Sequence, residues 1–150
     1  MRIIAFDLGR NFAFAHNAID GKLTTETIFL KPEQRAHRFI ACFDWLDARI
    51  GQLKLDAVVY ETPFARGRDP TRSLWGYAAL IEAIASRYKL PVMDVATPTI
   101  KKSATGHGKA SKYEMIFAAQ RMGYTGRNEH MADAVCLLRY AEANLERVLS

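Results

Sequence analysis

Two short apolar segments, each ending in a carboxylate, constrain the fold more than any other feature of this sequence. Residues 2–9 and 56–61 contain continuous apolar runs instead of alternating apolar and polar residues. Such runs are typical of strands buried on both faces, which occur in sheets covered by helices on both sides. The sequence therefore predicts an α/β fold built around a central sheet.

The other predicted elements alternate between strands and helices. The dipeptide Asp20-Gly21 favours a tight turn between two strands, and Ser111 with Glu114 has the spacing of a helix capping box. In chain order we expect strands at 2–9, 12–19 and 23–30, a helix at 33–53, a strand at 56–61, a loop at 66–72, a helix at 73–88, a strand at 91–95, a loop at 97–110, a helix at 111–123 and a final helix from Asn128. This order resembles the ribonuclease H-like fold, a mixed five-stranded sheet with helices on both faces.

Length, cysteine content and charge limit the class of protein. A chain of 150 residues is expected to form one domain, residues 1–150, around a single core. Cys42 and Cys136 lie in apolar helical patterns, which indicates buried thiols in a reducing compartment. No segment is apolar enough for a membrane span or a signal peptide, so we expect a cytoplasmic protein without membrane contact. The net charge of +5 permits a nucleic-acid partner.

Three carboxylates are predicted to converge. Asp7 and Glu61 end the two buried strands, and Asp133 lies near the start of the last helix. A right-handed crossover would place the two strands in parallel, about 4.8 Å apart, so their acids would meet at the edge where ligands bind. Each acid alone could instead form a turn, cap a loop or favour a helix N-terminus. Convergence of all three favours a site that holds a cation, because desolvating carboxylates is costly without one.

Two basic segments leave the same edge of the predicted sheet. One surrounds a pair of glycines and contains no acid between Val95 and Tyr113; the other follows Glu61. Their basic residues are Lys101, Lys102, His107, Lys109 and Lys112 in the first, and Arg66, Arg68 and Arg72 in the second. Either segment alone could be a solvated face. Together, on both sides of an acid cluster, they suggest that a phosphate backbone is delivered to a metal site.

These segments resemble the RuvC family of Holliday-junction resolvases. The resemblance covers residues 3–9, 58–64, 101–112 and 130–137, in that order. It implies an endonuclease that acts as a homodimer on branched DNA, especially four-way junctions. The basic stretch is its most specific part, because few nucleases with an acid triad carry such a segment before that helix.

The resemblance also implies roles for individual residues. Asp7, Glu61 and Asp133 would be metal-binding carboxylates, and His130 stands where the family usually has a further acid. His130 precedes Asp133 by three residues, so both lie on one helix face. Phe64 occupies the position of an aromatic residue that helps to open base pairs; alternatively, it could cover the core.

The expected chemistry is metal-dependent hydrolysis of a phosphodiester. Two Mg²⁺ ions, for which Mn²⁺ could substitute, would be held by Asp7, Glu61, His130 and Asp133, activate a water and stabilise the leaving 3′ oxygen. Lys101, Lys102, Lys109 or Lys112 would offset the charge of the pentacovalent phosphate, with Lys102 and Lys109 expected in the catalytic site. The products would be a 5′ phosphate and a 3′ hydroxyl. The DNA-binding residues would be Phe64, Arg66, Arg68, Arg72, Lys101, Lys102, His107, Lys109 and Lys112.

Three other functions compete with junction resolution. A branch or flap endonuclease would use the same site with less selectivity. The tripeptide at residues 7–9 is similar to the phosphate loop of the actin and sugar-kinase superfamily, but that fold needs two such domains and 150 residues leave no room. A junction-binding protein without activity would not need the three acids, so their presence disfavours it.

Overall fold

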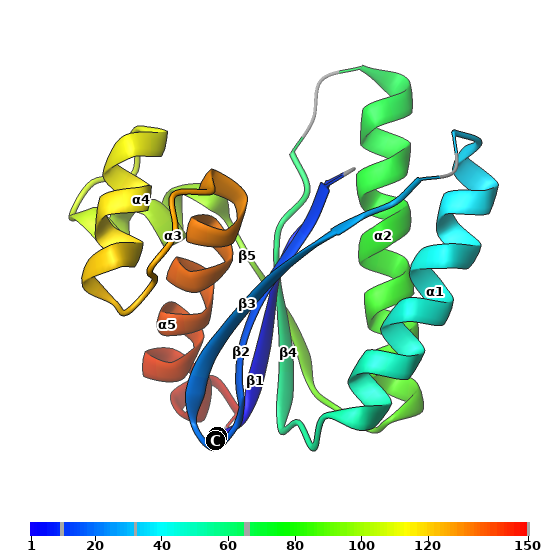
Figure 1. Cartoon of the computed structure of the whole chain (residues 1–150), viewed down its shortest axis with the longest axis horizontal. Helices are drawn as coiled ribbons and strands as arrows, with labels where there is room; N and C mark the ends of the chain where they lie inside the picture. Colours follow the sequence, from blue (N-terminus) through cyan, green and yellow to red (C-terminus); the bar gives the residue numbers. More distant parts are fainter. Residues whose placement is uncertain (10, 32, 65–66, 150) are drawn as a thin grey trace.

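A five-stranded sheet lies between two helical layers in the computed structural model, which describes residues 1–9, 11–31, 33–64 and 67–149. Figure 1 shows α1 and α2 on one face of the sheet and α3, α4 and α5 on the other. The elements are β1 (Ile3–Asp7), β2 (Asn11–Ile19), β3 (Lys22–Phe29), α1 (Arg35–Gln52), β4 (Ala57–Glu61), α2 (Arg68–Arg87), β5 (Val92–Val95), α3 (Thr97–Thr105), α4 (Lys112–Arg121) and α5 (Glu129–Leu149). The predicted layered fold is confirmed.

The order of the strands brings the first and fourth side by side. The sheet runs β3-β2-β1-β4-β5. β1 pairs antiparallel with β2 and parallel with β4, and β4 is also parallel to β5. Phe6 of β1 lies opposite Tyr60 of β4, so the next residues, Asp7 and Glu61, end these strands at the same edge. This confirms the predicted adjacency.

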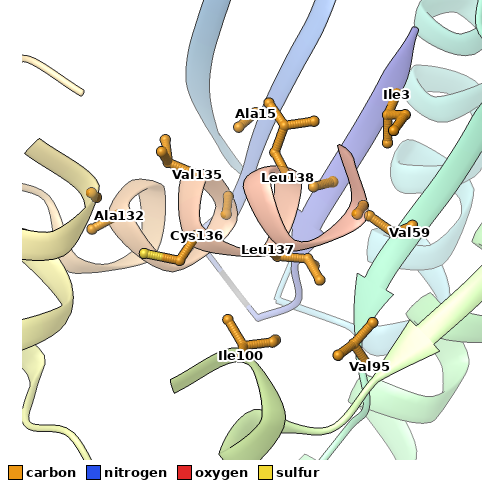
Figure 2. Packing of buried hydrophobic residues seen from close by; sticks show 14 of the residues in the cluster. Ile3, Ala15, Val59, Val95, Ile100, Ala132, Val135, Cys136, Leu137 and Leu138 are labelled. Carbon is orange, nitrogen blue, oxygen red and sulfur yellow. The ribbon is translucent and has the colours of Figure 1, made fainter. Parts of the chain in front are cut away.

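The core has two sides because β1 is buried on both faces. Ile3 and Ala5 pack into the cluster under α3, α4 and α5, whereas Ile4 and Phe6 pack into the cluster under α1 and α2. Figure 2 shows the first cluster, in which α5 lays its apolar face on the sheet. Each large aliphatic or aromatic side chain buried in this way contributes about 1.5–3 kcal/mol to folding. The two helical layers therefore hold the central strands β1 and β4, which end in Asp7 and Glu61, in place.

Several local predictions are confirmed. Asp20 and Gly21 both have positive φ, 54° and 69°, as the type I′ turn of a two-residue hairpin requires. Ser111 Oγ accepts a hydrogen bond from the Glu114 backbone N–H at 3.2 Å, and the Glu114 carboxylate accepts one from the Ser111 N–H at 3.2 Å. Both cysteines are buried free thiols, and burial raises the pKa of Cys42 and Cys136 to about 12.

The predicted loop at 97–110 is wrong for its first part, because α3 occupies Thr97–Thr105. Pro98 lies in the first turn, where its missing N–H costs nothing. Gly106 ends the helix in the left-handed region with φ 95°. Ile100 is the one buried residue of the helix, so the sequence shows no apolar periodicity there.

The predicted loop at 66–72 is also wrong for most of its length. α2 begins at Arg68, five residues before the expected start, and therefore includes Arg68 and Arg72. Pro70 is tolerated in a first turn, and Asp69 stabilises the positive end of the helix dipole. Arg66, a predicted DNA contact, lies outside the described residues.

Candidate metal centre

Three acids meet at the carboxyl edge of the sheet. Asp7 ends β1, Glu61 ends β4, and Asp133 comes from the first turns of α5. Each offers a carboxylate oxygen, and these oxygens all lie within 4.8 Å of one another. Across the described parts of the chain, no other set of three His, Cys, Asp or Glu side chains gathers in this way. The predicted convergence is therefore observed.

The three carboxylates repel one another. Burial and, next, the nearby charge of Asp7 together raise the pKa of both Glu61 and Asp133 to about 7. The ammonium of Lys101 acts in the opposite direction on both groups. A divalent cation would remove this repulsion, and hard carboxylate oxygens are the ligands that Mg²⁺ and Mn²⁺ prefer. The donor set therefore fits the metal that the sequence predicted.

A hydroxyl group orients one of the acids. Thr97 Oγ1, at the N-terminus of α3, donates a short hydrogen bond to Glu61 Oε1. That bond leaves the other oxygen of Glu61 for another partner, and it lowers the pKa of Glu61 against the effect of burial. No pattern in the sequence pointed to Thr97, because it lies 36 residues from Glu61 in a segment predicted to be a loop.

His130 contacts an acid of the cluster. Its Nδ1 lies 2.9 Å from Asp7 Oδ2, and this hydrogen bond raises the pKa of His130. The start of α5 is fixed by Asn128 Oδ1, which accepts hydrogen bonds from the backbone N–H groups of His130 and Met131, both at 2.9 Å. His130 therefore holds Asp7 in the observed arrangement. A direct bond from His130 to an ion stays a prediction.

An open cleft adjoins the acids. It has a volume of about 260 Å³, and Asp7, Glu61, Phe64 and Thr97 contribute to its lining. The side chain of Phe64 is 81% exposed. This exposure contradicts the alternative that Phe64 covers the core, and it leaves the ring free to contact a ligand beside the acids.

The predicted basic residues differ in their distance from the acids. Lys101 lines a small pocket together with Glu61 and Asp133. Lys102 and Lys109, predicted to act at the phosphate, are exposed, as are Arg68, Arg72 and Lys112. His107 is also exposed and places Nε2 2.6 Å from Glu114 Oε2. The lysine that the structure brings to the acids is thus Lys101.

A mixed sheet in this strand order, with three acids at its carboxyl edge, defines a ribonuclease H-like fold. Solved structures with a similar fold include Thermus thermophilus RuvC, which matches with a TM-score of 0.80 at 19% identity over 99% of this chain and 97% of that one. The same protein in complex with a Holliday junction substrate matches with a TM-score of 0.82 at 20% identity over 99% and 96%.

A second similar structure is the yeast mitochondrial Holliday junction resolvase Ydc2, with a TM-score of 0.65 at 13% identity over 97% of this chain and 80% of that one. The fold of this chain is thus the fold of the RuvC resolvases. Neither a scan against protein-family models nor a search of curated proteins found a match. Within the ranges that the structure describes, none of the helices has the length and apolar character needed to cross a membrane.

Proposed function

We propose that this protein belongs to the RuvC family and is a metal-dependent endonuclease that resolves four-way DNA junctions. The observation that carries the proposal is the cluster of Asp7, Glu61 and Asp133, within 4.8 Å of one another, at the carboxyl edge of a sheet that has the RuvC fold. Three converging carboxylates, two of which (Glu61 and Asp133) have raised pKa values, destabilise a fold that has no cation to bind, so a structural role alone does not explain them.

The three acids would hold one or two Mg²⁺ ions, and Mn²⁺ would substitute for them. Metal bound there supplies an activated water and stabilises the leaving 3′ oxygen, so that the cut leaves a 5′ phosphate and a 3′ hydroxyl. Thr97 orients Glu61, and His130 orients Asp7. As the sequence predicted, the imidazole of His130 would also be a ligand of the ion.

Positive charge would meet the DNA on two sides of the acids. Lys101, close to Glu61 and Asp133, would offset charge at the scissile phosphate, with Lys102 and Lys109 farther out. Lys112, His107, Arg68 and Arg72 would bind flanking phosphates; Arg66 is included by sequence alone. The exposed ring of Phe64 would stack on a base next to the cleft and stabilise an opened junction.

Resolution of a junction needs two cuts on opposing strands, so we propose a homodimer. A twofold axis would present two identical acid sites to the DNA. Exposed apolar side chains on α1 and α2, including Ile40 and Trp75, are available to form such a contact. A cytoplasmic location would agree with the two free thiols.

A cleavage assay tests this function. The protein is incubated with labelled four-way, three-way and linear DNA of the same sequence, with Mg²⁺, with Mn²⁺ or with a chelator. We expect paired, metal-dependent cuts in the four-way junction and at least tenfold slower cutting of the other substrates. Equal cutting of the four-way and three-way DNA would identify a broader branch nuclease instead.

Substitution of each acid separates chemistry from binding. Asp7→Asn, Glu61→Gln and Asp133→Asn should each lower the rate of cutting by at least about 10³-fold. Affinity for the junction should stay within about threefold, because the phosphate contacts come from other residues. A variant that cuts at the wild-type rate would remove its residue from the site.

A further inference from the structure

The net charge of this chain is confined to one segment. Residues 97–127, which include α3 and α4, contain six Lys or Arg residues and one acid, Glu114. The rest of the sequence carries 15 basic and 15 acidic residues and is therefore neutral. The whole +5 thus lies in the segment that joins β5 to α5, and a polyanion would be attracted to this side of the molecule.

The outer face of α4 in this segment carries two exposed aromatic side chains. Met115, Ala118 and Ala119 turn the inner face of α4 into the core. Tyr113 and Phe117, one helical turn apart, are 72% and 61% exposed. Figure 1 shows α4, coloured yellow, as an outermost element on its side of the sheet. The exposure of Tyr113 and Phe117 places both rings on the solvent side of this helix.

Each of these rings has a cation over one of its faces. Lys112 Nζ lies 5.2 Å from the centre of the Tyr113 ring, and the guanidinium carbon of Arg121 lies 5.1 Å from the centre of the Phe117 ring. The acid of this helix is already engaged, because Glu114 pairs with His107 and with the Ser111 backbone. The face therefore carries two aromatic side chains, each paired with a basic side chain.

Resting on the proposed nuclease function, we propose that this α4 aromatic face (Lys112, Tyr113, Phe117 and Arg121) binds single-stranded DNA, such as the unpaired nucleotides of a branched substrate. Aromatic rings stack on bases of any sequence, and neighbouring cations bind the phosphates. The charge of the segment favours this polyanion over a protein partner.

The spacing of the rings favours unpaired DNA over duplex. Residues four apart on a helix are separated by about 6 Å along its axis, which exceeds the roughly 3.4 Å between stacked bases in one strand. A base on each ring must therefore be unstacked from its neighbour. In a duplex the faces of the bases are covered by stacking, so only an unpaired strand offers them to both rings.

Binding of labelled oligo(dT) of about 12 nucleotides to the full-length protein tests this proposal. Tyr113→Ala and Phe117→Ala should each weaken binding about tenfold, and the double variant more. Tyr113→Phe should restore binding, because it keeps the ring. The matched control is Phe29→Ala on β3, another exposed ring (55%) outside the basic segment, which should bind like the wild type. Circular dichroism and the melting temperature check that each variant is folded.

Two results would overturn the inference. The first is unchanged oligo(dT) affinity in the folded double variant. The second is an equal loss of binding in Phe29→Ala. If the double variant keeps its affinity for oligo(dT) but changes its oligomeric state, the inference is also overturned. The two rings would then belong to a contact between protein chains. Failure here differs from failure of the proposed function, because junction cutting by the wild-type protein is measured without oligo(dT).

Discussion

The acid cluster and the basic segment at residues 97–127 place their charges in opposite ways. The cluster draws Asp7, Glu61 and Asp133 from three different elements and holds them largely buried within 4.8 Å. The basic segment keeps its cations contiguous in the sequence and, apart from Lys101, exposed. Salt screens exposed charges over about 10 Å, whereas buried charges interact strongly. The rate of cutting should therefore depend on the exact positions of the three acids, and the affinity for DNA on the number of exposed cations.

Phe64 lies between the two regions and provides the test with the largest expected effect. It lines a hollow of about 460 Å³ with Pro98, Lys101 and Gly108 of the basic segment. Stacking on a base is worth about 1–3 kcal/mol, so Phe64→Ala should slow resolution of a fully paired junction by about 5–150-fold. A junction with unpaired bases at its crossover should be slowed much less. Equal slowing of both substrates would mean that Phe64 does not act by opening base pairs.

A substitution of Thr97 tests whether metal binding depends on the exact orientation of Glu61. Thr97→Val removes the hydroxyl that orients Glu61 and keeps the shape of the side chain. Partners of metal-binding side chains typically contribute about 10–100-fold, so affinity for Mn²⁺, measured by calorimetry without DNA, should fall about tenfold. Thr97→Ser should restore it. If Val and Ser behave alike, Thr97 serves only the packing of α3.

Lys101 and Lys102 sharpen the contrast because they are neighbours with different surroundings. Lys101 lies beside Glu61 and Asp133, whereas Lys102 is exposed. Each substitution by Ala should lower the salt dependence of junction binding by about one unit of slope for each phosphate that the variant no longer binds. Lys101→Ala should in addition slow cutting at saturating DNA. Equal cutting by the two variants would place both lysines in binding alone.

The smallest expected effect concerns stability and pH. The pKa of Glu61 and of Asp133 is raised to about 7 in the folded protein. As pH rises from about 4.5 to 7, these two carboxyl groups therefore lose their protons in the unfolded chain before they lose them in the folded protein. The metal-free protein should therefore become less stable over that range, and added Mg²⁺ at pH 8 should reverse the loss. Asp133→Asn should raise the melting temperature at pH 8 by about 3–6 °C and remove the effect of Mg²⁺.

The control for this prediction is Asp44→Asn, at an exposed position of α1, which should change neither quantity. Thermal melts with a chelator and with Mg²⁺, at pH 5 and pH 8, supply the measurement. A wild-type melting temperature that rises between pH 5 and pH 8 without metal would contradict the repulsion inferred for the acid cluster.

Much of the fold followed from local patterns in the sequence. The continuous apolar runs before Asp7 and Glu61 indicated buried parallel strands, and the position of those acids at the strand ends then predicted their meeting. The Asp20-Gly21 turn was likewise predictable, because the backbone conformation it needs is specific to a few residue types.

What the sequence did not predict depends on contacts between distant residues. α3 has a single buried side chain, Ile100, and two glycines follow it, so neither periodicity nor composition indicated a helix. The hydrogen bonds from Thr97 to Glu61 and between His130 and Asp7 join residues 36 and 123 positions apart. The orientation of the acids could therefore be found only after the layers were assembled.

The basic segment also has a consequence for how such a protein can change over generations. It enters after β5 and returns at α5, as one uninterrupted stretch of chain. A single recombination event could exchange this stretch between relatives and bring a new substrate preference without altering the acids of β1, β4 and α5. The exchange must preserve the side chains that face inward, such as Ile100 and Met115, and also Thr97 and Lys101, which lie at the acids. Target choice and catalysis can then diversify at separate rates within one small gene.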